Sequence, residues 1–184
     1  MRIRPATPDD ALPLARLHVA AWRAAYRGLV PDAFLDDLDA DARAAHFRSW
    51  PAAGEAENHV AEEDGELRGW PTADGCCDSD VDPQTTGEIW GIYSAPGHWR
   101  QDLGRMLCRY GDGAAARSCD PAATWSPPYG FLAGTRGRGA FTRPWAFSPM
   151  VPKSLDFGVP LEAVRCRKTL GADLIRSGGS PGPA

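Results

Sequence analysis

Apolar residues near the start of the chain recur at spacings of three and four, which is the period of an amphipathic helix. A short apolar stretch around Ile3 is typical of a first strand, and Pro8, Asp9 and Asp10 then supply an acidic first turn. The apolar stripe consists of Leu14, Leu17, His18, Ala21, Trp22 and Ala25. The pattern therefore predicts a helix over residues 9–26 that packs one face against a core.

The rest of the chain alternates between helical and strand patterns. Helices are predicted over residues 31–38, 41–50 and 102–116, and strands over 59–62, 66–73, 88–94, 122–125 and 164–170. A turn is predicted over 51–54, and Asp64-Gly65 is a typical hairpin turn. Pro71 indicates an edge strand or a bulge, because proline cannot donate to a ladder. We expect a disordered tail over residues 171–184.

This alternation predicts the class of fold. Helices alternate with strands, while one hairpin is antiparallel, so we expect an α/β (α+β) layered domain in which helices cover a mixed sheet. The chain has 184 residues, of which 43% are hydrophobic, and this is enough for one core. We therefore predict a single domain over residues 1–170.

Composition narrows the classes of partner. The net charge of −4 provides no positive field for nucleic acid or an acidic membrane surface, and we expect neither partner. We find no apolar run long enough for a membrane span and no export signal, so we predict a cytoplasmic protein. Asp78, Asp80 and Asp82 imitate a calcium loop, but Pro83 and Ile89 stand where glycine and glutamate are needed. The five cysteines show no CxxC spacing, and we predict no metal.

Three features could carry chemistry. Glu88 opens a predicted strand between Gly87 and Ile89, where partial burial could raise its proton affinity and make it a general base; the alternative is a surface glutamate. Trp22 and Tyr26 could line a pocket or belong to the core. The stretch HWRQDLGRML at residues 98–107 connects a strand to a helix, and the first amides of a helix can bind an anion.

Several stretches together resemble the GCN5-related N-acetyltransferase (GNAT) family. They are IRPATPDDALPLARLHVAAWRAAYRGLVPDAFL, HVAEEDGELRGW, TTGEIWGIYSAPGHWRQDLGRMLCRYG and KSLDFGVPLEAVRCRKTL. The resemblance implies a GNAT-like, mostly antiparallel central sheet flanked by helices. It also implies acetyl-CoA as cosubstrate, with the backbone of Ile92, Tyr93 and Ser94 along its pantetheine arm.

The family motif Q/R-x-x-G-x-G/A reads here Gln101-Asp102-Leu103-Gly104-Arg105-Met106. The resemblance implies that the amides of these six residues hold the pyrophosphate of acetyl-CoA. Two positions depart from the family: Asp102 stands where relatives often have glycine, and Met106 replaces glycine or alanine. We expect Asp102 to add like-charge repulsion and Met106 to add bulk, both of which would weaken binding.

The C-terminal third departs further from the family. Thr135 falls at the position of an asparagine that helps to hold the cofactor. Phe141 or Thr142 falls at the position of a tyrosine that protonates the leaving thiolate, and neither side chain replaces a phenol. Either the fold is rebuilt here, or the segment reflects a reading-frame disturbance that recovers by Lys153.

The combined interpretation is an N-acetyltransferase that moves an acetyl group from acetyl-CoA to a primary amine of a small molecule or peptide by direct attack. Glu88 would accept the proton of the ammonium group, and Trp22 and Tyr26 would contact the acceptor. The alternative is a catalytically impaired, GNAT-like acyl-CoA-binding or regulatory module. A homodimer is a possible assembly for either.

Overall fold

The computed structural model describes residues 1–53, 57–75, 86–117, 129–132, 148–149, 153–156 and 160–167. Its main sheet has four antiparallel strands in the order β1-β2-β3-β4: β1 (Arg2–Pro5), β2 (Glu57–Glu63), β3 (Glu66–Gly75) and β4 (Gly87–Ser94). A second sheet contains β5 (Tyr129–Leu132), β6 (Ser148–Pro149), β7 (Lys153–Asp156) and β8 (Pro160–Arg167), and β8 pairs antiparallel with each of the other three. Within the described ranges, all ladders between these strands are antiparallel.

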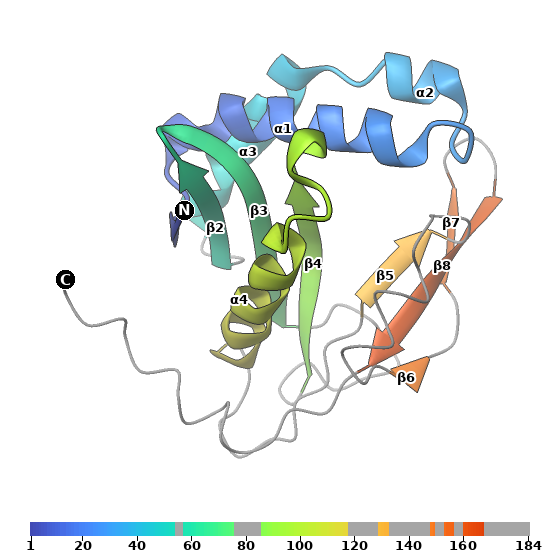
Figure 1. Ribbon diagram of the computed structural model, residues 1–184. Coiled ribbons are helices and arrows are strands. Elements are labelled where there is room, and N and C mark those ends of the chain that lie inside the picture. The colour runs from blue at the N-terminus through green and yellow to red at the C-terminus, as the bar shows by residue number, and fades with distance from the viewer. Residues whose placement is uncertain are drawn as a thin grey trace.

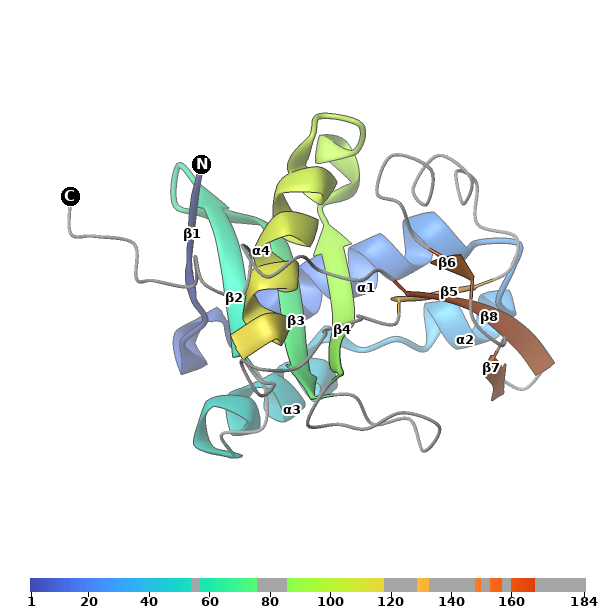
Figure 2. The ribbon, with the colours of Figure 1, turned by 90° about the horizontal axis from the view of Figure 1, so that it is seen from below.

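Helices cover both faces of the main sheet. The helical elements of the described residues are the 3-10 turn η1 (Pro8–Asp10), α1 (Ala11–Tyr26), α2 (Asp32–Asp36), α3 (Ala40–Ala53), the 3-10 turn η2 (Pro96–His98) and α4 (Leu103–Arg117), of which α1, α3 and α4 cover the sheet. The two views show α1 and α3 on one face of the sheet and α4 on the other (Figures 1 and 2). The prediction of a mostly antiparallel sheet flanked by helices is therefore confirmed. In the part of the chain described here, no helix has the length and apolarity that crossing a membrane requires.

A compact polar cluster fixes the start of α1 to the sheet. Arg4 in β1 donates to both carboxylate oxygens of Asp10, at 2.7 and 2.9 Å, and to Glu62 in β2 at 2.7 Å. The Asp10 carboxylate also accepts bonds from the backbone and hydroxyl of Thr7. The bonds from Arg4 are the main reason that the pKa of Asp10 lies below its ordinary value. Asp10 of the acidic first turn predicted from the sequence thus forms an ion pair with Arg4 that joins β1, β2 and the helix.

Each face of the sheet has its own apolar core. The α1 and α3 face buries a cluster of Ala11, Leu14, Ala15, Ala44, Phe47, Val60 and Trp70. The α4 face buries Ala61, Leu103 and Leu107. Here α4 lies so close to β3 that a Cβ at Gly69 would come within 2.6 Å of the Leu107 side chain. The position of α4 is therefore set by close contact with the sheet.

One local prediction was wrong, and of the two alternatives predicted at Pro71 the bulge is confirmed. The turn predicted over 51–54 is helical as far as Ala53, because Pro51 removes only one helix bond and the alanines that follow favour helix. β3 lies inside the sheet, so Pro71 does not mark an edge strand; a bulge does follow it, between Thr72 and Ala73. The predicted strand 122–125 and tail 171–184 lie outside the described residues.

Candidate active site

β4 carries an extra residue at its centre. Thr72 pairs with Gly91 and Ala73 pairs with Ile89, so Trp90 has no partner on β3. Ile89 faces α4, where a Cβ at Gly111 would lie 2.9 Å from it, and Ile92 also packs with the α4 cluster. Two residues three apart share a face only where a bulge interrupts the alternation of a strand. The bulge therefore divides the outer strand of the main sheet into two short segments.

Side-chain hydrogen bonds hold the connection from β4 to α4. The indole nitrogen of Trp99 donates to the carbonyl of Ser94 at 2.9 Å, and the Gln101 amide donates to the carbonyl of Gly97 at 3.1 Å. The backbone N–H of Ala95 donates to the carbonyl of Arg68 in β3 at 2.8 Å. These bonds attach the turn to the end of the sheet, so its backbone is preorganised.

The backbone of this turn has the geometry of an anion-binding nest. Arg100 and Asp102 have positive φ values of 63° and 61°, and Leu103 begins α4 directly afterwards. A left-handed residue followed by a right-handed one makes successive N–H groups converge. The N–H of Met106 already donates to the Asp102 carbonyl, whereas the N–H groups before it in the helix belong to the first turn, which lacks intrahelical acceptors. This arrangement suits a phosphate group.

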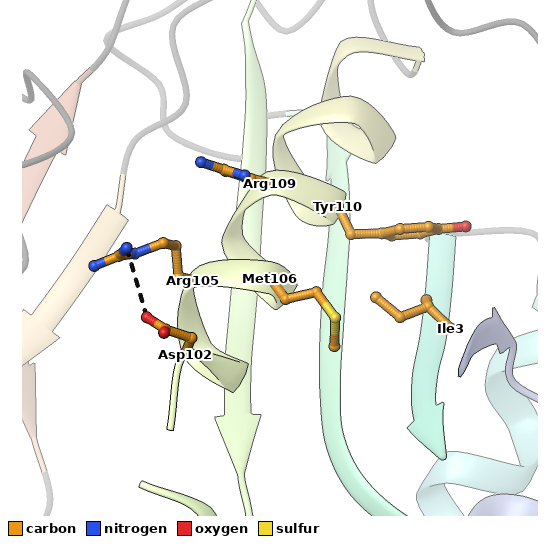
Figure 3. A pocket seen from close by; sticks show the side chains of 6 residues that line it. All are labelled: Ile3, Asp102, Arg105, Met106, Arg109 and Tyr110. Atoms are coloured by element: carbon orange, nitrogen blue, oxygen red, sulfur yellow. Dashed lines mark ion pairs between the residues drawn. The ribbon is translucent and has the colours of Figure 1, made fainter. Parts of the chain in front are cut away.

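The space beside the turn is open at Gly104. No atom lies within 4 Å of the position that a Cβ would take there. The Met106 side chain packs against the buried cluster of the α4 face and points toward Ile3, away from Asp102 and Arg105 (Figure 3). The methionine therefore does not place its bulk over the turn, contrary to our expectation from the sequence. The diphosphate of acetyl-CoA fits a turn with this open glycine and these converging amides.

The aspartate that departs from the family motif lies at the same place. The Asp102 side chain is 81% exposed, and its carboxylate lies 3.5 Å from the guanidinium of Arg105. This ion pair is the dashed line in Figure 3. A carboxylate at a helix N-terminus stabilises the free protein, because it interacts with the positive end of the helix dipole. A diphosphate would interact with the same positive end, so the carboxylate competes with it.

The predicted acceptor residues lie against β4 on the side of α1. Trp22 donates from its indole nitrogen to the Tyr93 hydroxyl at 3.3 Å, and the Tyr26 ring lies 4.7 Å from that of Trp22. Burial raises the pKa of Tyr26 to about 12 and also raises that of Tyr93. His18 lies 4.6 Å from the Tyr93 ring, and burial, followed by the charge of Arg43, lowers its pKa to about 3. At neutral pH this wall is aromatic and uncharged.

Glu88 lies at the opposite end of β4 from the turn. Its neighbour Ile89 faces α4, so the half-buried Glu88 faces the α1 side of the sheet. The acidic Asp74 is its register partner on β3. Ser94 follows Glu88 by six positions, which corresponds to about 20 Å of strand. A cosubstrate bound at the turn would have to extend along β4 to bring its reactive end near this carboxylate.

Some of the site could not be found from the sequence. Nothing in the sequence indicated the left-handed conformation of Arg100 or the hydrogen bond from Trp99 to the turn. Nor did it indicate that Trp90 has no register partner on β3. An aspartate tolerates the left-handed region, so Asp102 offered a weak signal. Thr135 and the alternatives Phe141 and Thr142 lie outside the described residues. Among the residues that are described, no group of acidic, histidine or cysteine side chains could hold a metal ion.

Known proteins share the fold of this chain. The model of the acetyltransferase (GNAT) family matches residues 19–120. Among solved structures, ribosomal-protein-alanine N-acetyltransferase from Brucella melitensis has a TM-score of 0.67 at 20% identity, with 92% of this chain and 100% of that one covered. yncA from Salmonella typhimurium, solved with its cofactor acetyl-CoA, has a TM-score of 0.67 at 20% identity, with 92% and 94% covered.

A third similar structure is the PaiA N-acetyltransferase from Thermoplasma acidophilum in complex with coenzyme A. Its TM-score is 0.67 at 11% identity, with 92% of this chain and 98% of that one covered. No curated protein matches the chain. At these identities the solved structures show the fold, whereas the family model spans more than half of the chain. This protein therefore belongs to the GNAT family of acetyltransferases, enzymes whose cosubstrate is acetyl-CoA.

Proposed function

We propose that the chain transfers the acetyl group of acetyl-CoA to a primary amine of a small molecule or peptide, by direct attack of the amine. The observation that carries the proposal is the turn from β4 to α4, in which a left-handed Asp102 and an open Gly104 direct first-turn amides at one place. Acetyl-CoA supplies an acetyl group activated as a thioester. The protein must then hold acetyl-CoA at its phosphate-rich end and at its thioester end. It must also position the amine.

Each end of β4 has its own part in this proposal. Of the amides of residues 101–106, those before Met106 would hold the diphosphate, since the Met106 N–H already donates to the Asp102 carbonyl. The backbone of Ile92, Tyr93 and Ser94 would bind the pantetheine arm. The support for the second role is that β4 is the end strand of the main sheet, so one of its edges has no ladder in the described residues. An extended arm with amide groups can bind such an edge as an added strand does.

The acceptor would approach from the α1 side. Trp22 and Tyr26 would contact it, because their rings lie against β4 on the face toward which Glu88 is directed. Glu88 would accept the proton of the ammonium group, directly or through a water molecule, so that the amine can attack. An uncharged aromatic wall beside the acceptor favours the neutral, nucleophilic amine over the ammonium form.

Two measurements test the proposal. Calorimetry should show that the protein binds acetyl-CoA, and a free-thiol assay with a panel of primary amines should show CoA release that depends on the amine. Glu88→Gln should lower kcat/KM at neutral pH by about 10²-fold or more and remove the basic limb of the pH profile. Glu66→Gln, an exposed glutamate at the start of β3, is the matched control and should behave as the wild type.

A second candidate is a module that binds acyl-CoA without turnover. The observation that favours it is the sequence at positions 141 and 142, where neither phenylalanine nor threonine can protonate a leaving thiolate as a phenol can. Binding of acetyl-CoA without amine-dependent thiol release would favour the module. Absence of binding would contradict both candidates.

A further inference from the structure

On the α1 side of the main sheet, one cation has no acidic partner among the described residues. Arg43 is in the first turn of α3, one turn before Phe47, whose ring lies 6.0 Å from the His18 ring on α1. Arg43 is half-buried, and it forms no ion pair or side-chain hydrogen bond in the part of the chain that the structure describes. A charge that is partly removed from water normally has a partner, so this guanidinium indicates a bound anion.

Two buried polar atoms on the same face also lack a partner within the described ranges. They are Nδ1 of His18, a residue that is 5% exposed, and Oγ1 of Thr72 in β3, which is 4% exposed. The His18 ring lies 4.6 Å from the ring of Tyr93. A Cβ at Gly91 would lie 2.7 Å from the Tyr93 ring and 3.4 Å from the methyl group of Thr72, so these side chains share one face of the sheet. Buried polar atoms are nearly always hydrogen-bonded, and two unpartnered ones indicate that a polar group binds here.

This face of the sheet has a negative end and a positive end. The proposed base Glu88 lies near the start of β4, and Tyr93 follows it by five positions. Burial raises the pKa of Tyr93, while the bond from Trp22 and the charge of Arg43 oppose the rise, so Arg43 acts near this second position. An amine that also carries an anion is complementary to both ends. A carboxylate matches the planar fork of a guanidinium, which can donate two parallel bonds to it.

We propose that the acceptors are small amino acids, in which a carboxylate accompanies the primary amine, and that Arg43 binds this carboxylate. Neutral His18 and the hydroxyl of Thr72 can each donate one further hydrogen bond to it. The inference rests on the proposed function and names the class of its acceptor. Arg43 is a specificity determinant: it acts on the affinity for the acceptor and takes no part in the attack of the amine or the departure of the thiolate.

The test compares amino acids with their carboxamides as acceptors in the free-thiol assay. The carboxamide has the less basic amine, so the reactivity of the amine alone would favour it. For the most active pair, kcat/KM of the wild type should be roughly 10- to 100-fold higher with the amino acid, because a charged hydrogen bond is lost with the carboxylate. Arg43→Gln should raise KM for the amino acid alone, and Arg43→Lys should restore part of the preference. Arg48→Gln, an exposed arginine of the same helix, is the matched control and should keep the wild-type preference.

The outcomes separate this inference from the proposed function. If no amine gives thiol release, the proposed function fails. If the wild type uses carboxamides as well as amino acids, or if Arg43→Gln raises both KM values by the same factor, the function stands and the inference is wrong. The preference of the wild type needs no variant, so a folding defect cannot hide the answer. Arg43→Gln should still bind acetyl-CoA as the wild type does in calorimetry, a result that a general loss of structure would not give.

Discussion

Replacing Asp102 with asparagine should tighten the binding of acetyl-CoA. The substitution removes the carboxylate from the turn, while asparagine tolerates the left-handed φ of 61° as well as aspartate does. The lost contact with Arg105 is 3.5 Å long, and the Asp102 side chain is 81% exposed, so the effect on folding should be small. The change therefore isolates the charge at this position.

The expected gain follows from the distance between two negative groups. A diphosphate held by the first amides of α4 would lie roughly 6 Å from the carboxylate of Asp102. At that distance and an effective dielectric constant of about 40, two like charges repel by about 1.4 kcal/mol. Arg105 offsets part of the repulsion, and the diphosphate carries more than one charge. We expect a net gain of about 1–2 kcal/mol, which is about 5- to 30-fold in the dissociation constant.

Calorimetry with acetyl-CoA would measure this effect at two salt concentrations. Asp102→Asn and Asp102→Gly should both bind more tightly than the wild type, and the gain should shrink at high salt because the charges are exposed. Asp64→Asn is the matched control, since Asp64 is also left-handed, with φ 53°, but lies in the β2–β3 turn. Unchanged or weaker binding by Asp102→Asn would show that the diphosphate is not held beside this carboxylate.

Two further predictions concern stability. Asp10→Asn should lower the free energy of unfolding at pH 7 by about 2 kcal/mol, because Arg4 loses its buried partner. The folded pKa of Asp10 is below its ordinary value, so this contribution is present above the unfolded pKa of about 3.9 and is lost as the pH falls through the folded pKa. Urea titrations of wild type and variant should therefore converge in strong acid, and a constant gap down to pH 2 would contradict the reasoning. Gly69→Ala should lower the free energy of unfolding by about 1–3 kcal/mol, because its Cβ would lie 2.6 Å from Leu107 and 3.1 Å from the Tyr93 carbonyl. Gly97→Ala is the control: no atom lies within 4 Å of its Cβ position, so it should be nearly neutral in the same urea titrations. Equal effects of the two glycine substitutions would refute the packing argument.

Periodic features of the sequence predicted most of the fold. The helix predicted over 9–26 is α1 with its preceding 3-10 turn, the strand predicted over 88–94 is β4, and the helix predicted over 102–116 is α4. These segments are long and amphipathic, so local pattern and tertiary packing agree. Where they compete, tertiary packing decides: at Pro71 only the bulge alternative is confirmed, because β3 pairs with β2 on one side and with β4 on the other.

The candidate site was less predictable for a physical reason. The motif Gln101–Met106 located the turn, but the direction of each side chain depends on contacts with distant residues. Met106 is directed to Ile3 in β1, which no local pattern encodes. The roles of Glu88, Trp22 and Tyr26 stay predictions, as does the cytoplasmic location. Their test lies in the kinetics described above.

The bulge at Trp90 also bears on strand pairing at the outer edge of β4. An outer strand with a continuous row of unpaired N–H and C=O groups is a template for another chain, and natural sheets commonly interrupt such rows. β4 has only short regular segments on either side of Trp90, so an incoming strand could form few consecutive bonds before losing register. A flexible ligand with isolated amide groups tolerates the interruption, whereas a second polypeptide does not. Under the proposed function, the same irregularity would admit the cosubstrate while limiting the addition of a strand along this edge.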